Sequence, residues 1–192
     1  MNRLQCEKLA SLIHNKASKE LIVTYVRELQ EISMKNKKVK WLEALIKFET
    51  FLENGTLVSK VFAINGNGKL PFLSFSSLAG MPCIGAGECL KFCYSFRAWR
   101  YPYPFFRQLQ NYILLEFKQG QKIIEAELLK AIEAIKRRNE SKGKGKSQID
   151  FRLYVDGDFH SEECLLFWMK QIKNNSILST YGYSKSFGLF LN

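Results

Sequence analysis

Hydrophobic residues in the first third of the chain recur every three to four positions, which is the period of an α-helix. One series runs through residues 3–32, and a second runs through residues 41–52 after a polar break at residues 34–38. This spacing puts the hydrophobic side chains on one face of each helix, where they usually pack against a protein core. Gly55 follows the second series and is typical of a helix end. We therefore predict an N-terminal helical extension over residues 1–55.

Short segments rich in β-branched and aromatic residues alternate with helical patterns in the rest of the chain. Strands are predicted over residues 57–65, 70–76, 149–155 and 177–183, and helices over residues 88–97, 105–117, 123–135 and 161–173. This order is typical of βαβ units, in which parallel strands form one sheet. The predicted fold class is α/β, with a partial parallel barrel or an open parallel sheet in a domain over residues 56–192. Since the chain ends soon after the last predicted strand, we also expect a C-terminal truncation relative to its relatives.

The chain carries 29 Lys and Arg against 18 Asp and Glu, which gives a net charge of +11. Such an excess favours contact with nucleic acid, which is therefore a predicted partner. Part of the excess lies in a predicted flexible linker over residues 140–147, which contains Lys142, Lys144 and Lys146. No run of about 18 hydrophobic residues is present, so we expect no spanning helix and no membrane partner. The charged N-terminus is unlike a signal peptide, and we expect a cytoplasmic protein.

Three of the five cysteines, Cys83, Cys89 and Cys93, lie close together with the spacing C-x5-C-x3-C. Thiolates are soft ligands for metal ions and iron–sulfur clusters, and Gly85 and Gly87 allow the tight turns that such a loop needs. The predicted helix over residues 88–97 would place Cys89 and Cys93 one turn apart on the same face. An odd number of cysteines in a reducing compartment favours metal binding over a disulfide. The alternative is that these thiols are buried and inert.

Polar segments follow three of the predicted strands: the cysteine loop, Asp156–Ser161 and Ser184–Ser186. Because the carboxyl ends of parallel strands meet at one edge of a sheet, we expect these segments to form one site. Gly157 and Asp158 are predicted to hold a ligand there, although a turn followed by a capped helix explains the same residues. His160 is either a further metal ligand or a structural histidine.

Residues 97–107 combine three arginines with five aromatic residues. Cationic groups and flat rings together clamp phosphates and stack on bases. The two prolines in the segment also fit a connection between helices that is packed by its rings. Both interpretations of this segment stay open at the level of sequence.

An ordered series of short motifs resembles the gene-88 family of phage and plasmid proteins. The resemblance covers about residues 70–186 and rests on Leu78–Cys83, Glu88–Cys89, Cys93–Tyr94, Arg100–Tyr101, Asn111, Val155–Ser161 and Tyr181–Ser186. It implies a protein of a mobile element and does not specify a reaction.

A looser likeness is to radical S-adenosylmethionine enzymes, in which three cysteines after the first barrel strand hold a four-iron cluster. The three clustered cysteines, with Phe92 beside the last, are similar to that loop, although its usual spacing is C-x3-C-x2-C. Gly157 and Asp158 are similar to the segment that holds the amino group of the cofactor. The likeness implies a 4Fe–4S cluster and S-adenosylmethionine bound near Gly157, Asp158 and Ser184. The chain departs from the pattern in that it supplies only about half of the strands of the usual barrel.

Three functions of different classes follow from these observations. The first is an iron–sulfur protein with Cys83, Cys89 and Cys93 as metal ligands. The second is a basic nucleic-acid-binding accessory protein, in which the same cysteines and His160 or Cys164 hold a structural zinc ion. The third is a helical interaction module whose cysteines are packed in its core.

Overall fold

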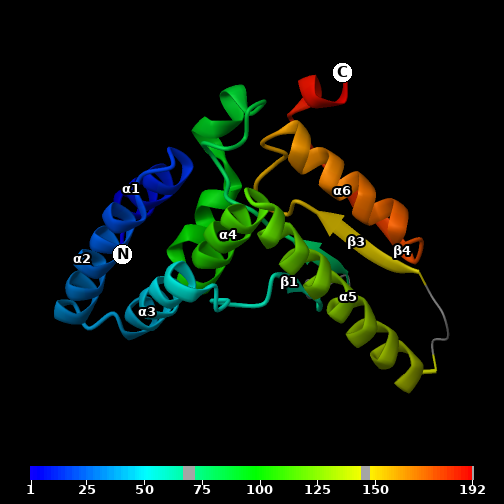
Figure 1. Ribbon diagram of the computed structural model, residues 1–192, viewed down its shortest axis with the longest axis horizontal. Coiled ribbons are helices and arrows are strands. Elements are labelled where there is room, and N and C mark those ends of the chain that lie inside the picture. Colours follow the sequence, from blue (N-terminus) through cyan, green and yellow to red (C-terminus); the bar gives the residue numbers. More distant parts are fainter. Residues whose placement is uncertain (67–71, 144–147, 192) are drawn as a thin grey trace.

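The computed structural model describes residues 1–66, 72–143 and 148–191. Three helices lie on one side of the molecule, a small sheet with two further helices lies on the other, and α4 lies between them (Figure 1). The helices on the first side are α1 (Arg3–His14), α2 (Lys19–Lys35) and α3 (Val39–Asn54). The remaining helices are α4 (Pro102–Leu115), α5 (Lys118–Ser141) and α6 (Glu162–Asn174).

Local signals set the ends of the N-terminal helices. At the start of α1, the Asn2 side chain accepts from the Gln5 backbone N–H, and the Gln5 side chain accepts from the Asn2 backbone N–H. Ser18 caps α2 in the same way, because its Oγ accepts from the backbone N–H of Leu21 at 3.2 Å. Helix α3 ends at Gly55, whose φ of +81° is a conformation that glycine adopts without strain. The predicted helical extension is therefore observed as three separate helices.

The N-terminal helices share their hydrophobic core with the rest of the chain. The ring of Trp41 packs edge-on against Phe106 of α4, and the ring of Phe48 lies 4.9 Å from that of Phe106 between centroids. Both phenylalanines are fully buried. The predicted boundary at residue 55 thus falls at a helix end, and the core continues across it.

One sheet of four strands forms the centre of the second side. Its strands are β1 (Phe62–Ala63), β2 (Leu73–Phe75), β3 (Ile149–Leu153) and β4 (Leu178–Gly182), and they lie in this order. Strands β2, β3 and β4 are parallel, which confirms the predicted α/β class and open parallel sheet. Strand β1 departs from the prediction, because it pairs with β2 in the antiparallel direction.

The first predicted strand, over residues 57–65, is observed only at β1. At the beginning of this segment the backbone forms a hydrogen bond with a side chain and not with a neighbouring strand. The backbone N–H of Val58 donates to Oε1 of Gln110 at 2.6 Å. The side-chain amide of Gln110 in turn donates to the carbonyl of Ser59. Gln110 comes from the buried face of α4, so this contact depends on the tertiary fold. Of the second predicted strand, over residues 70–76, the first two positions lie outside the described residues.

The predicted α-helix over residues 88–97 is wrong. Two 3₁₀-helices, η1 (Gly87–Phe92) and η2 (Tyr94–Arg100), occupy this part of the chain. They are separated at Cys93, whose ψ of 118° is not helical. The turns are tighter than those of an α-helix, since the N–H of Cys89 bonds to the carbonyl of Ala86, three residues earlier. Cys89 and Cys93 therefore do not lie one turn apart on a common α-helical face.

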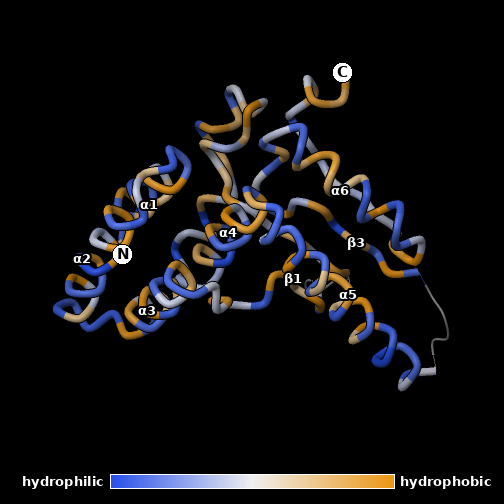
Figure 2. The backbone as a smooth tube through the Cα atoms, viewed as in Figure 1, coloured by the Kyte–Doolittle hydropathy of each residue, from blue (hydrophilic) through white to orange (hydrophobic). Residues whose placement is uncertain are grey.

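Helix α5 is longer than predicted at both ends. Its buried residues Ile124, Leu128 and Ile132 recur every four positions, and along the tube hydrophobic and hydrophilic residues alternate turn by turn (Figure 2). The helix continues to Ser141, into the segment predicted as a flexible linker. Residues 144–147 of that segment, including Lys144 and Lys146, lie outside the described residues.

The two faces of the sheet differ in chemistry. Trp168 of α6 packs its ring against Phe75 and Phe151, so α6 covers the face that carries these aromatic residues. On the opposite face Ser74, Arg152 and Tyr181 are aligned in register on three neighbouring strands. Helix α6 begins as predicted, because Oγ of Ser161 accepts from the N–H of Cys164 at 3.1 Å.

Candidate functional site

A pocket of about 250 Å³ lies where the parallel strands end. Its lining comes from the segment after β2, from the end of β3 with the residues that follow it, and from the segment after β4. The lining includes the three cysteines of the predicted cluster, Cys83, Cys89 and Cys93, and the three predicted cofactor-binding residues, Gly157, Asp158 and Ser184. The expected convergence of three polar segments at one edge of the sheet is therefore observed.

The environment of this pocket disfavours the charged form of the Cys83 thiol. Burial raises the pKa of the Cys83 thiol to about 12, and the nearby Asp158, Cys93 and Cys89 raise it as well. All three cysteines are partly buried, and none forms a disulfide. Cys83 is thus protonated at neutral pH, so a metal ligand at this position must first release its proton.

The thiols are not arranged around the position of a single ion. Among residues 1–66, 72–143 and 148–191, no three His, Cys, Asp or Glu side chains are grouped so that they could hold one metal ion. A zinc ion with Zn–S bonds of about 2.3 Å brings its thiolate ligands to within about 4 Å of one another. The cysteines share a pocket but do not form such a tight set.

Asp158 links the loops after β3 and β4. One carboxylate oxygen accepts from the backbone N–H of Phe159 at 2.8 Å, and the other accepts from the N–H of Lys185 at 2.7 Å. The side chain is buried, with 4% of the residue exposed, while it also borders the pocket. Each oxygen has further lone pairs, so these bonds leave acceptor capacity toward a ligand.

Two glycines are required at this edge because backbones approach one another closely. Gly157 has a φ of +81°, and an added Cβ would lie 2.8 Å from the carbonyl oxygen of Ser77 in the segment after β2. At Gly85 an added Cβ would overlap the backbone carbonyl of Lys185 in the segment after β4. Contacts between loops therefore require glycine at both positions, and ligand binding at Gly157 stays a prediction.

Ser184 belongs to a short chain of hydrogen bonds on the same loop. Its Oγ accepts from the backbone N–H of Ser186 at 3.0 Å, and Oγ of Ser186 donates to the carbonyl of Phe159 at 2.9 Å. These bonds fix the segment after β4 against the segment after β3. Ser184 therefore has a structural partner in addition to its position on the pocket.

Arg152 and Tyr94 also line the pocket and were not expected there. Arg152 lies on β3, and its buried Nε has no hydrogen-bond partner in the part of the chain that the structure describes. Tyr94 donates its hydroxyl hydrogen to the carbonyl of Val155, which ties η2 to the end of β3. Arg152 occupies a polar position of an alternating strand, like Asp150, so its charge was a weak sequence signal for a site. No comparable signal marked Tyr94.

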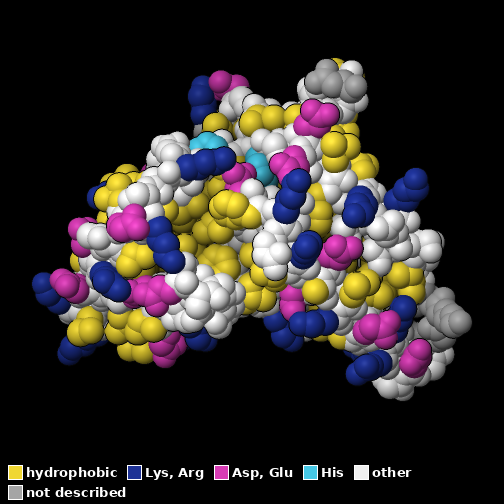
Figure 3. Space-filling view, viewed as in Figure 1, with side chains coloured by type: hydrophobic (Ala, Val, Ile, Leu, Met, Phe, Trp, Pro, Cys, Tyr) yellow, Lys and Arg dark blue, Asp and Glu magenta, His cyan; other side chains and the backbone are white. Residues whose placement is uncertain are grey.

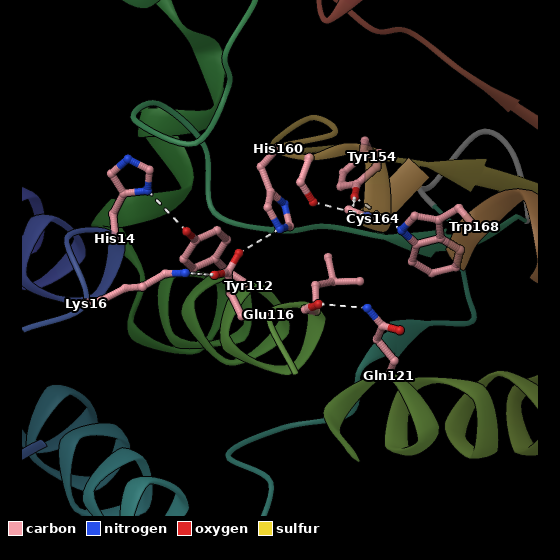
Figure 4. A network of polar contacts seen from close by, with 11 residues as sticks. His14, Lys16, Tyr112, Glu116, Gln121, Tyr154, His160, Cys164 and Trp168 are labelled. Carbon is pink, nitrogen blue, oxygen red and sulfur yellow. Dashed lines mark hydrogen bonds and ion pairs between the residues drawn. The ribbon is translucent and has the colours of Figure 1, made fainter. Parts of the chain in front are cut away.

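The two expected fourth ligands of a zinc ion do not line this pocket. Nε2 of His160 lies 2.9 Å from Oε1 of Glu116, and Sγ of Cys164 lies 3.0 Å from the hydroxyl of Tyr154 (Figure 4). Burial lowers the pKa of His160, and it raises the pKa of Cys164 to about 11. Both residues therefore have structural partners outside the pocket, and a zinc ion with either of them as its fourth ligand stays a prediction.

The segment over residues 97–107 divides into a buried and an exposed part. Trp99, Phe105 and Phe106 are buried in the core, as the interpretation of a ring-packed connection requires. Arg97 and Arg100 remain exposed. On the face of the molecule in Figure 3, Lys and Arg are mixed with Asp and Glu around a central group of hydrophobic side chains. No helix among the described residues is long and hydrophobic enough to cross a membrane.

Comparison with known proteins gives one result. The family described as Gene product 88 matches residues 44–192. The match begins inside α3, earlier than residue 70, where the resemblance of the motifs begins. No curated protein and no solved structure matches the chain significantly.

Proposed function

Since the chain belongs to the gene product 88 family, we propose that it is a phage or plasmid protein that binds an iron–sulfur cluster through Cys83, Cys89 and Cys93. The observation that carries this proposal is the presence of all three thiols in one pocket at the carboxyl ends of the parallel strands. Thiolates are the usual protein ligands of iron–sulfur clusters. Cys6 and Cys164 are buried elsewhere in the core and are not ligands in this proposal.

A four-iron cluster does not require the three thiolates to converge on one ion. A four-iron cluster places each thiolate on a different iron, so its ligands are farther apart than those of one zinc ion. This agrees with three cysteines that share a pocket without forming a single-ion group among the described residues. The remaining candidates for a fourth zinc ligand, His160 and Cys164, bond to Glu116 and Tyr154.

The pocket also offers groups for a small polar cofactor, for which we propose S-adenosylmethionine. Three cysteines would leave one iron of a four-iron cluster without a protein ligand, and such a cluster, once reduced by an external electron donor, would supply one electron to a bound cofactor. Asp158 would accept from the amino group of the cofactor, and Arg152 would pair with its carboxylate. Ser184 and the backbone at Gly157 would border the same ligand. The unpaired Nε of Arg152 supports this assignment.

Anaerobic reconstitution with iron and sulfide tests the cluster. The wild-type protein should gain a broad visible absorbance, with iron and acid-labile sulfide in equal amounts. Each of Cys83→Ala, Cys89→Ala and Cys93→Ala should lose most of both. Cys6→Ala and Cys164→Ala are matched controls, since they remove one thiol outside the pocket and should retain the cluster. Equal iron in all five variants, or no iron in the wild type, would overturn the proposal.

Equilibrium dialysis with labelled S-adenosylmethionine tests the cofactor separately. Arg152→Gln should reduce the affinity of the reconstituted protein by about tenfold or more, because a charged hydrogen bond contributes about 1.5–3 kcal/mol. Its iron content should not change. Lys170→Gln removes the same charge from exposed α6 and serves as the control. An unchanged affinity in Arg152→Gln would rule out this cofactor site while leaving the cluster in place.

A further inference from the structure

A second pocket, of about 550 Å³, lies on the other side of the segment that carries Cys93. Its cationic lining residues are Arg3, Lys91, Arg97 and Arg100, and no described Asp or Glu lines it. The volume lies within the range of about 300–1,000 Å³ that is common for small-ligand sites. The positive lining selects for an anion.

Two of the four cations are not neutralised by neighbours. Arg3 pairs with Glu7 at 2.7 Å, and Lys91 pairs with Glu88 at 2.6 Å. Arg97 and Arg100 are exposed and form no ion pair or hydrogen bond with any residue in the described ranges. They lie three positions apart on η2, and side chains with this spacing project from the same side of a 3₁₀-helix. The two guanidinium groups thus form one unpaired site with donors for a phosphate.

An exposed aromatic ring lies at the same pocket. Phe92 lines it and is 76% exposed, so most of its hydrophobic surface is in contact with water. The neighbouring Phe96 is already covered, since the guanidinium carbon of Arg3 lies 4.7 Å from its ring centroid. Phe92 is therefore the ring that remains available for stacking on a flat ligand.

From these contacts we infer that the second pocket binds a nucleoside phosphate, with its phosphate on Arg97 and Arg100 and its base stacked on Phe92. Bases stack on aromatic side chains while cationic groups hold the backbone phosphates. The ligand is a free nucleotide or a nucleotide within a single strand, and the net charge of +11 attracts either one. This inference does not depend on the proposed cluster, because it rests on residues outside the first pocket apart from Cys93.

Binding experiments at low salt on the metal-free protein test whether Arg97 and Arg100 bind the phosphate. The ligands are inorganic phosphate, adenosine monophosphate and a fluorescent single-stranded oligothymidylate. The double variant Arg97→Gln, Arg100→Gln should bind adenosine monophosphate and the oligonucleotide about tenfold more weakly or worse. The control double variant Arg137→Gln, Lys170→Gln removes two exposed charges from α5 and α6, and its affinity for the same ligands should fall by less than about threefold. An equal loss in both double variants, or no binding by the wild type, would overturn the inference.

The variant Phe92→Ala tests whether the base of the ligand stacks on this ring. The variant should bind adenosine monophosphate and the oligonucleotide about fivefold more weakly or worse, because stacking on one ring contributes about 1–3 kcal/mol. Its affinity for inorganic phosphate should not change. The matched control is Phe187→Ala, which removes a similarly exposed ring that does not line this pocket. Equal effects of Phe92→Ala on all three ligands, or none, would contradict the stacked base. Tighter binding of the oligonucleotide than of the mononucleotide identifies a single strand as the ligand, and equal affinity identifies the free nucleotide.

Cys93 provides an independent check on position, since it lines both pockets. A bound nucleotide should slow the alkylation of Cys93 by iodoacetamide and leave that of Cys83 unchanged. Binding without any protection of Cys93 would place the ligand elsewhere on the surface and overturn the assignment.

Discussion

The β3–α6 unit (residues 149–174) and the cysteine segment (residues 79–100) border the same pocket but are stabilised in different ways. Trp168 of α6 is fully buried and packs on rings from three strands, whereas Phe92 of the cysteine segment is 76% exposed. The cysteine segment is anchored in the core at Trp99, and around the cysteines it is held by backbone proximity at Gly85 and by the hydrogen bond from Tyr94 to Val155. The β3–α6 unit is thus stabilised mainly by packing of its buried side chains, whereas a few specific contacts position the cysteines on the other side of the pocket.

The largest effect should follow from removing a buried side chain from the core of the β3–α6 unit. Trp168→Ala should lower the free energy of unfolding by about 3–5 kcal/mol, because it removes a large buried ring and leaves a cavity. Met169→Ala is the control, since Met169 is 43% exposed on the same helix and its loss should cost less than about 1 kcal/mol. Denaturant unfolding followed by circular dichroism measures both. Equal costs would show that the sheet face is not the main core of this unit.

A smaller and more local effect should follow from separating the cysteine segment from the segment after β4. Gly85→Ala would overlap the carbonyl of Lys185 and should cost about 1–3 kcal/mol. In the Gly85→Ala variant, the rate of amide hydrogen exchange should rise in residues 79–100 and stay unchanged in α6. Gly87→Ala is the comparison, because an added Cβ there meets open space and only the φ of +46° opposes it. A cost at Gly87 larger than at Gly85 would contradict the proposed contact between the loops.

The hydroxyl of Tyr154 should contribute about 1–2 kcal/mol, since it accepts from Nε1 of Trp168 at 3.2 Å and contacts Sγ of Cys164. Tyr154→Phe removes this hydroxyl and leaves a buried N–H without its partner. The backbone of Tyr154 has a φ of +56°, so its side-chain contacts also hold an uncommon conformation at the pocket. Thermal unfolding of Tyr154→Phe and of the exposed control Tyr183→Phe measures the difference. No difference between the two variants would remove this role of Tyr154.

The smallest effect concerns pH. Burial lowers the pKa of His160 below its usual value of about 6.5, and the nearby His14 and Lys16 lower it too, while Glu116 opposes the shift. Tyr112, the other titratable group beside His160, packs its ring against the imidazole. The unfolded state therefore binds a proton more readily, and stability should fall as the pH drops below about 6.5. His160→Gln should flatten this part of the pH profile; an equally steep profile would exclude His160 as its source.

The structure of the β3–α6 unit was predicted from the sequence more accurately than that of the cysteine segment, for physical reasons. Strand β3 and helix α6 follow from local alternation and from the cap at Ser161, which act over a few residues. The meeting of the thiols with Asp158 follows from the rule that parallel strands end at one edge. These parts of the site needed no knowledge of distant contacts.

The remaining parts depend on contacts far apart in the chain. The second 3₁₀-helix is held against Val155 by Tyr94, and the chain before the first one approaches Lys185 at Gly85; a helical periodicity reveals neither contact. The shortness of β1 results from the side chain of Gln110, and the role of Gly157 results from its approach to Ser77. Arg152 could have been suspected from its charge, but only the sheet register places it at the pocket.

Mössbauer spectroscopy of protein reconstituted with enriched iron tests the central claim most directly. The account predicts the spectrum of a four-iron cluster in the wild type, with one iron whose signal changes when S-adenosylmethionine is added. Arg152→Gln should keep the cluster and lose that change. A mononuclear iron spectrum, or a cluster that persists in Cys83→Ala, Cys89→Ala and Cys93→Ala alike, would contradict the claim that these three thiols form the site.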